Sequence, residues 1–297
     1  MSLFFLSLLF SVFASSALAR PMARQSSSTC STPDRRVDWT SLSSGQKSDY
    51  FEAVNCLKAA PSKLHMNNAQ SLYDDLVVIH QTQADTGAGT DSWHFVGQFM
   101  HVHRYYVHLY ETLLRNECGY TGPMVYWNEE RDADSYSNSA TIQDFGGFGS
   151  NNNNWQVSQG PFSNWTFHVG PGSNNYDHPI TRAVNERQAR SSGKWYVDGV
   201  KTQKTFADFK DLLYDTLHIA GHNGLGGGRG DISNVWAEWQ GTDDARIHDL
   251  ADAGTETQKG STPTTPQTQL YMYDLIKTAT VADVASTTEG LLCYTYQ

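Results

Sequence analysis

The 297-residue sequence contains few charged residues and, beyond its first nineteen positions, no long apolar run. Only 18% of residues are charged and 12% are aromatic, the opposite of the balance in disordered chains, so a folded globular protein is predicted. No later segment reaches the roughly 18 apolar residues of a membrane-spanning helix, so no membrane association of the mature chain is expected. The net charge of −10, without a basic stripe, argues against nucleic-acid binding.

The amino-terminal segment is the one strongly apolar stretch. Residues 1–19, MSLFFLSLLFSVFASSALA, are typical of a signal peptide that is cleaved after Ala19. We therefore expect a secreted protein whose mature part, residues 20–297, forms a single domain. The sequon Asn164-Trp165-Thr166 agrees with secretion and predicts a glycoprotein.

Cysteine is scarce, and no two of the four cysteines form a CxxC pair, so a cysteine-based zinc site is not expected. An even number of cysteines in a secreted chain predicts two disulfides, for which three pairings exist. The pairing we favour joins Cys56 to Cys118 within the domain and Cys30 to Cys293 between its two ends.

Hydrophobic periodicity predicts a mainly α-helical fold, an antiparallel helix bundle with long irregular loops and a few short strands. Helices are expected at residues 47–58, 69–82, 96–116 and 205–222. A stretch rich in Gly, Asn and Pro at about 145–176 predicts an irregular excursion, and the final LCYTYQ predicts a short strand.

Histidines occur at positions that favour a metal centre in the core of the bundle. His80 and His103 lie on the apolar faces of two predicted helices, and His94 shortly precedes the second helix. His218 and His222 lie one turn apart on a common helix face. A single buried histidine is more often structural, but inward imidazoles on several packed helices are how bundles hold copper, zinc, iron or nickel.

Several segments around these histidines resemble the tyrosinase/polyphenol oxidase family of type-3 copper proteins, and in particular its short, secreted fungal members. The spacing of eight residues between His94 and His103, and Arg104 after the latter, match the first copper-site signature. The segments that carry the resemblance are YDDLVVIH (73–80), FMHVHRYYVHLYE (99–111), NECGYTGPMVYWNEERDA (116–133), LHIAGHNGLGGGRGD (217–231) and VWAEWQ (235–240).

The resemblance implies a copper-dependent oxidoreductase. In that family six histidines hold two copper ions, three histidines for each ion, and the pair of ions binds O2. His80, His94 and His103 match the ligands of the first copper, and His218 and His222 match two ligands of the second. The implied reaction is oxidation of a small phenolic or o-diphenolic substrate, with or without prior hydroxylation by monooxygenase chemistry, in secondary metabolism.

One family segment is missing. The stretch S-P-x-D-P-x-F-x-x-H-H-x-x-x-D, which carries the sixth histidine, has no counterpart between Asp231 and Val235, and His248 lies too late to replace it. Three explanations are open: an exon absent from this sequence, a replacement ligand such as Asp231 or Asn223, or a site used for other chemistry. Ile219 stands where an Asn often accompanies hydroxylation, which favours diphenol oxidation.

Two alternative functions follow from the incomplete second site. The first is a redox-neutral, zinc-dependent lyase-type enzyme, similar to the cyclopenase of quinolone alkaloid pathways. Zinc held by His80, His94 and His103 would keep an open fourth position and act as a Lewis acid. The second is a non-catalytic secreted binder, which is disfavoured because five inward histidines without a metal are costly buried polar groups.

Overall fold

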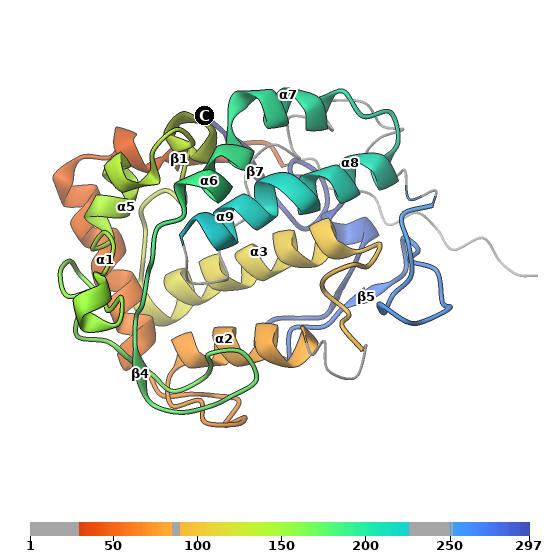
Figure 1. Cartoon of the computed structure of the whole chain (residues 1–297). Coiled ribbons are helices and arrows are strands. Elements are labelled where there is room, and N and C mark those ends of the chain that lie inside the picture. Colours follow the sequence, from red (N-terminus) through yellow and green to blue (C-terminus); the bar gives the residue numbers. More distant parts are fainter. Residues whose placement is uncertain (1–29, 85–89, 226–249, 251) are drawn as a thin grey trace, which may run out of the picture.

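The computed structural model describes residues 30–84, 90–225, 250 and 252–297, and the predicted signal peptide lies outside this part. Helices dominate the described residues, so the mainly α class is confirmed (Figure 1). The α-helices are α1 Ser44–Ala59, α2 Leu72–Gln83, α3 Phe99–Cys118, α4 Glu129–Asp132, α5 Ala140–Asp144, α6 Glu186–Ala189, α7 Lys194–Lys201, α8 Phe206–Leu213 and α9 Ile219–Gly224. A π-helical turn, Tyr214–His218, joins α8 to α9 in one continuous rod.

The strands are short and lie at the periphery. They are β1 Asp34–Asp38, β2 Val125–Tyr126, β3 Thr166–Phe167, β4 His178–Pro179, β5 Gln269–Leu270, β6 Ala279–Thr280 and β7 Tyr294–Tyr296. β1 pairs in parallel with β2 on one side and with β7 on the other, while β3–β4 and β5–β6 are antiparallel pairs. β7 is the strand predicted at the end of the sequence.

Local signals in the sequence explain where the long helices begin and end. Ser43 before α1 and Ser71 before α2 each accept a backbone N–H of the first turn, and a side chain three residues later bonds back to complete a capping box. α3 ends at Gly119, whose φ of 65° places it in the left-handed conformation that glycine adopts without strain.

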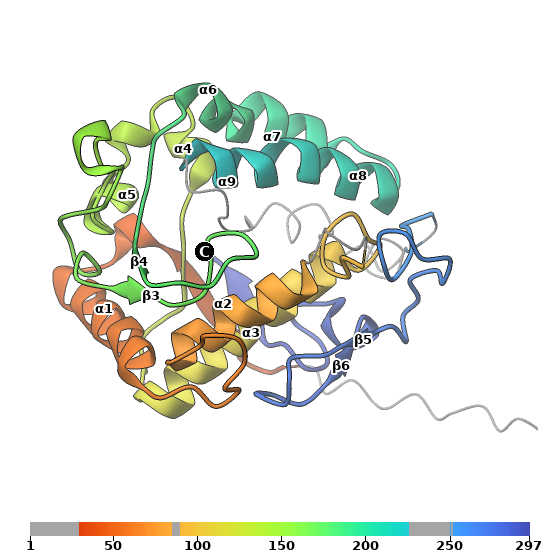
Figure 2. The same ribbon diagram turned by 60° about the horizontal axis from the view of Figure 1, so that its bottom comes forward.

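Helix α3 lies between α2 and the α8–α9 rod. α2 runs antiparallel to α3 on one side, where the Tyr106 hydroxyl donates to the carbonyl of Leu76 at 2.7 Å, and the α8–α9 rod lies on the other side (Figures 1 and 2). His101 packs on Phe206 of α8, so α3 is covered on more than one face. No helix of the described part is both long and apolar enough to cross a membrane.

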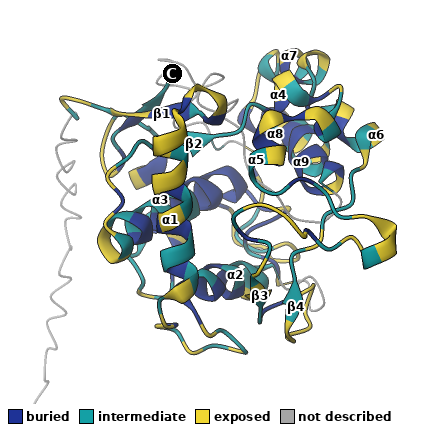
Figure 3. Ribbon diagram, turned by 90° about the vertical axis from the view of Figure 1, so that its left-hand side faces the viewer, coloured by how far each residue is buried: buried dark blue, intermediate teal, exposed yellow. Residues whose placement is uncertain are grey.

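The core has two main parts, and the histidines lie between them. The larger part joins α1, α2, α3 and the C-terminal segment around rings such as Trp39, which is 1% exposed. The second part packs Phe206, Phe209 and Leu213 of α8 against Val96 and residues of α3. Figure 3 shows that α1 has an exposed outer side, whereas α2 is mostly buried or half-buried.

Both favoured disulfides are present. Cys56–Cys118 ties the end of α1 to the end of α3, with Cα atoms 5.8 Å apart. Cys30–Cys293 joins the segment before β1 to the residue just before β7, with Cα atoms 5.5 Å apart. The first bond therefore links α1 to α3, and the second links the two ends of the described chain.

The C-terminal segment is also held by buried arginines. Arg104 of α3 donates to the carbonyls of Val284 and Ala285 at 2.9 and 2.7 Å. The guanidinium of Arg36 in β1 lies 3.5 Å from the ring centre of Tyr294 in β7, a cation–π contact. Arg104, which follows a metal-site candidate in the sequence, thus has a structural role in the domain.

Candidate metal centre

His80, His94 and His103 converge at one point although they come from three different segments. His80 lies in the last turns of α2, His94 in the loop before α3, and His103 in the second turn of α3. One ring nitrogen from each lies within 4.8 Å of the others, and among the described residues this is the only such group of three His, Cys, Asp or Glu side chains. We call these residues the histidine triad.

Hydrogen bonds orient two rings of the triad. The Asp91 carboxylate accepts the backbone N–H of His94 at 2.7 Å, and its second oxygen lies 3.2 Å from Nδ1 of the same ring. Nδ1 of His103 lies 2.8 Å from the carbonyl of Phe99, one turn earlier on α3. Carboxylate and carbonyl oxygens only accept, so the proton is assigned to Nδ1 in both rings and the lone pair to Nε2.

The protonation of the site fits a bound metal ion. Nε2 of His103 is buried and has no hydrogen-bond partner within the described part of the chain, which costs free energy unless a ligand satisfies it. Burial, reinforced by the neighbouring histidines, holds the pKa of His103 well below its usual value. Burial and the nearby His222 lower the pKa of His218 to about 2. Both rings are therefore neutral near pH 7, the form that copper or zinc binds.

The predicted pair on the α8–α9 rod faces the triad. The Nε2 atoms of His218 and His222 lie 2.9 Å apart. The His218 ring centre is 5.9 Å from those of both His94 and His103. The fold thus brings all five histidines singled out from the sequence into one region, three on one side and two on the other.

The structure tests the proposed replacement ligands only in part. Asn223 is exposed while the adjacent His222 is buried, so the two side chains lie on different sides of α9 and Asn223 does not fit the role. Asp231, His248 and the join near residues 231–235 lie outside the described residues.

Sequence reasoning missed the residues that surround the histidines. Trp93 is 3% exposed and its ring centre lies 5.5 Å from His80 and 5.6 Å from His103. The Phe99 ring lies 4.9 Å from His103 and 5.0 Å from His218, so it contacts both sides of the centre. These rings form an apolar wall that restricts water. The available signal was the short Asp91-Ser-Trp-His94 motif, in which an acidic residue precedes a ligand candidate by three positions.

Comparison with known proteins agrees with this arrangement. A family profile described as the common central domain of tyrosinase matches residues 70–243, a range that includes the triad and the His218–His222 pair. The chain therefore belongs to the tyrosinase family. Membership supports a type-3 copper oxidoreductase in general, because the family is one that acts on phenolic substrates with O2 and implies a dinuclear copper centre.

Individual relatives match over almost the whole chain. The chain is 26% identical to tyrosinase ustQ of Aspergillus flavus over 90% of its own length and 80% of that protein. It is 25% identical to tyrosinase P of Aspergillus terreus, with 90% of this chain and 93% of that protein covered. A solved polyphenol oxidase variant from Thermothelomyces thermophila superimposes with a TM-score of 0.76 at 25% identity, covering 89% of both chains.

Proposed function

We propose that the protein is a secreted oxidase with two copper ions, which uses O2 to oxidise an o-diphenolic substrate. The observation that carries the proposal is the position of the His218–His222 pair opposite the histidine triad. Two sets of imidazoles that face each other suit two metal ions that bind one O2 molecule between them.

In this proposal His80, His94 and His103 hold one ion, and His218 and His222 contribute to holding the other. When bound, copper supplies the electron transfer that couples the oxidation of two o-diphenols to two o-quinones with the reduction of one O2 to two waters. Asp91 keeps the Nδ1 proton of His94 in place, so that Nε2 stays available as a ligand. Trp93 and Phe99 exclude water from the rings they contact.

Metal content and oxygen consumption test the proposal together. The purified mature protein is reconstituted with copper and zinc in competition and analysed by mass spectrometry, and oxygen uptake is followed with catechol. We expect close to two coppers per chain and oxygen uptake that requires the diphenol. Fully metallated protein without diphenol turnover would contradict the proposal.

A second candidate is favoured by the triad being the only group of three ligand side chains among the described residues. A single zinc ion held by His80, His94 and His103 would act as a Lewis acid in redox-neutral, lyase-type chemistry. The same measurement separates the two functions, because this candidate requires one zinc per chain and no oxygen uptake. A chain that binds no metal tightly would instead be a binding protein.

We further propose that residues 1–19 are a signal peptide, that residues 20–297 form one secreted domain, and that the substrate belongs to secondary metabolism. The two disulfides support an oxidising compartment, and Asn164 of the sequon is exposed and therefore accessible for glycosylation. Amino-terminal sequencing of protein secreted by a fungal host is expected to begin after Ala19. A mass decrease on treatment with an N-glycosidase is expected, and Asn164→Gln should abolish it.

A further inference from the structure

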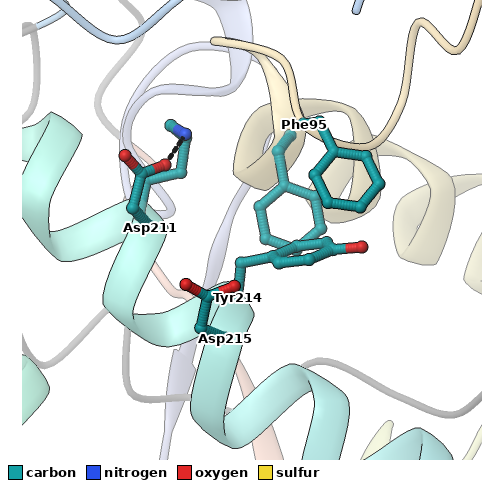
Figure 4. Close-up of a pocket in the computed structure, with 6 residues that line it drawn as sticks. Phe95, Asp211, Tyr214 and Asp215 are labelled. Atoms are coloured by element: carbon teal, nitrogen blue, oxygen red, sulfur yellow. Dashed lines mark hydrogen bonds and ion pairs between the residues drawn. The ribbon is translucent and has the colours of Figure 1, made fainter. Parts of the chain in front are cut away.

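A hollow of about 230 Å³ lies beside the histidine centre, between the α8–α9 rod and the loop that carries His94 (Figure 4). One wall is aromatic and the opposite edge is polar, where Lys210 pairs with Asp211. The residues that line the hollow are Phe95, Phe99, Lys210, Asp211, Tyr214 and Asp215.

Phe95 has a backbone conformation that is uncommon for a residue with a large side chain. Its φ is 54°, in the left-handed region that is disfavoured for residues with a Cβ. Residues held in such conformations occur often at ligand-binding sites. The residue is 52% exposed, whereas its neighbours His94 and Val96 are 8% and 0% exposed. The backbone therefore places a large apolar ring at the surface directly after a metal-site histidine.

Tyr214 connects this exposed ring to the metal centre. Its ring centre lies 4.7 Å from that of Phe95 and 5.1 Å from that of His218. It also lies 5.2 Å from Phe99, which itself contacts His218 and His103. A group that occupies the hollow therefore touches rings that pack directly on metal-site histidines.

The size of the hollow limits what it holds. Pockets that enclose a whole drug-sized ligand measure about 300–1,000 Å³. At about 230 Å³ the hollow is smaller, and its aromatic wall suits one apolar group, such as an alkyl branch or a single ring.

We propose that Phe95 and Tyr214 are specificity-determining residues that hold an apolar or aromatic substituent of the phenolic substrate. The proposal rests on the proposed oxidase function and adds the substrate class to it. Phenols that carry such a substituent are preferred over unsubstituted catechol, because the substituent occupies the hollow while the phenol reaches the metal centre.

The test removes the Phe95 ring without changing the backbone. Glycine adopts a φ of 54° freely, so Phe95→Gly deletes the side chain alone, and Phe95→Asn provides a second variant that tolerates this conformation. Phe95→Tyr keeps the ring. Trp155→Gly is the matched control. Trp155 lies in the loop before β3 and is also an aromatic residue that is exposed, at 40%, and has a positive φ, of 61°.

Two readouts are taken on the copper-loaded protein. Binding of 4-fluorobenzyl alcohol, a single-ring probe that is not a diphenol, is measured by ¹⁹F NMR, and kcat and KM are measured for catechol and for its tert-butyl derivative, 4-tert-butylcatechol. Loss of one aromatic contact is expected to raise the probe's Kd and the KM for the tert-butyl derivative about 3- to 10-fold in Phe95→Gly and Phe95→Asn. The KM for catechol and both kcat values should change less than about twofold, and Phe95→Tyr and Trp155→Gly should resemble the wild type.

The outcomes separate this proposal from the oxidase proposal. Unchanged probe binding and an unchanged KM for the tert-butyl derivative in both variants at Phe95, or equal losses for catechol, would overturn the substituent site while leaving the oxidase function intact. Probe binding that depends on Phe95 in a protein that turns over no diphenol would support the site and contradict the oxidase function.

Discussion

Replacing Asp91 by Asn tests how the fold directs His94 toward the metal. Asp91 is 1% exposed, and its carboxylate accepts the backbone N–H groups of Trp93 and His94 at 2.8 and 2.7 Å as well as Nδ1 of the His94 ring at 3.2 Å. Burial raises the pKa of Asp91, but hydrogen bonds from His94 and Trp93 outweigh it and lower the pKa below its usual value. The carboxylate is therefore ionised at neutral pH.

Asn preserves the shape of this side chain but not its hydrogen-bonding character. Its single oxygen can still accept the two backbone N–H groups, which leaves the amide NH2 facing Nδ1 of His94. A donor opposite a donor favours the tautomer with the proton on Nε2, the atom that a metal needs. Loss of such a supporting group typically weakens metal binding 10- to 100-fold, which corresponds to about 1.4–2.7 kcal/mol.

The assay is a competition titration of copper against a chelator, combined with urea unfolding of the metal-free protein. Asp75→Asn is the matched control, because Asp75 is 0% exposed and accepts from Ser62 Oγ at 2.6 Å and Lys63 N at 2.7 Å rather than from a histidine. We expect both variants to lose stability, by about 1–3 kcal/mol, and Asp91→Asn alone to lose copper affinity. Equal copper affinity in Asp91→Asn and the wild type, or equal losses in both variants, would refute the reasoning.

Three other perturbations have defined outcomes. His103→Ala removes the buried Nε2 of the triad, so metal content should fall by at least one ion per chain; unchanged content measured by mass spectrometry would contradict the triad. Replacing Cys56 and Cys118 by Ser removes a crosslink that spans 62 residues. The loss of this constraint on the unfolded chain should lower the free energy of unfolding, measured in urea, by about 4 kcal/mol. A loss below about 1 kcal/mol would contradict that account. Asp132 accepts from Trp127 Nε1 at 2.7 Å, and although burial raises its pKa, hydrogen bonds lower it overall. Asp132→Asn should therefore lower the free energy of unfolding by about 1–2 kcal/mol at pH 7. The difference from the wild type should shrink as pH falls from 5 to 2, because the Asp132 carboxylate stabilises the fold only while it is ionised. A difference that is independent of pH would contradict this reasoning.

The long helices were predictable because apolar residues recur along them at helical spacing, and because Gly119 marks the end of α3. The expected helix at 96–116 is observed as α3, Phe99–Cys118, and the one at 69–82 as α2, which begins after the Ser71 cap. The short helices α4, α5 and α6 were not predicted, because four or five residues are too few to show a helical period. The π-helical turn was also missed, since it changes the backbone hydrogen bonds and not the pattern of side chains.

The residues of the candidate site likewise fall into those that the sequence predicted and those that it did not. Helical periodicity identified His80, His103 and the His218–His222 pair, because inward polar residues on an apolar face are conspicuous. Asp91 and Phe95 lie in a loop without any period, so their roles depend on backbone conformations that only the folded chain shows. The position of Phe95 relative to Tyr214, more than a hundred residues later, follows from packing between elements distant in sequence.

The π-helical turn between α8 and α9 has a consequence for how this chain tolerates change in length. A π-turn accommodates one additional residue while the helix on either side keeps its rotational phase. The apolar residues of α8 and His222 of α9 can therefore each face their own partners along one rod. Insertion or deletion of a residue within a regular α-helix would rotate α9 by about 100° relative to α8. His222 would then point away from the histidine triad. The π-helical turn therefore determines which face of the rod carries His222.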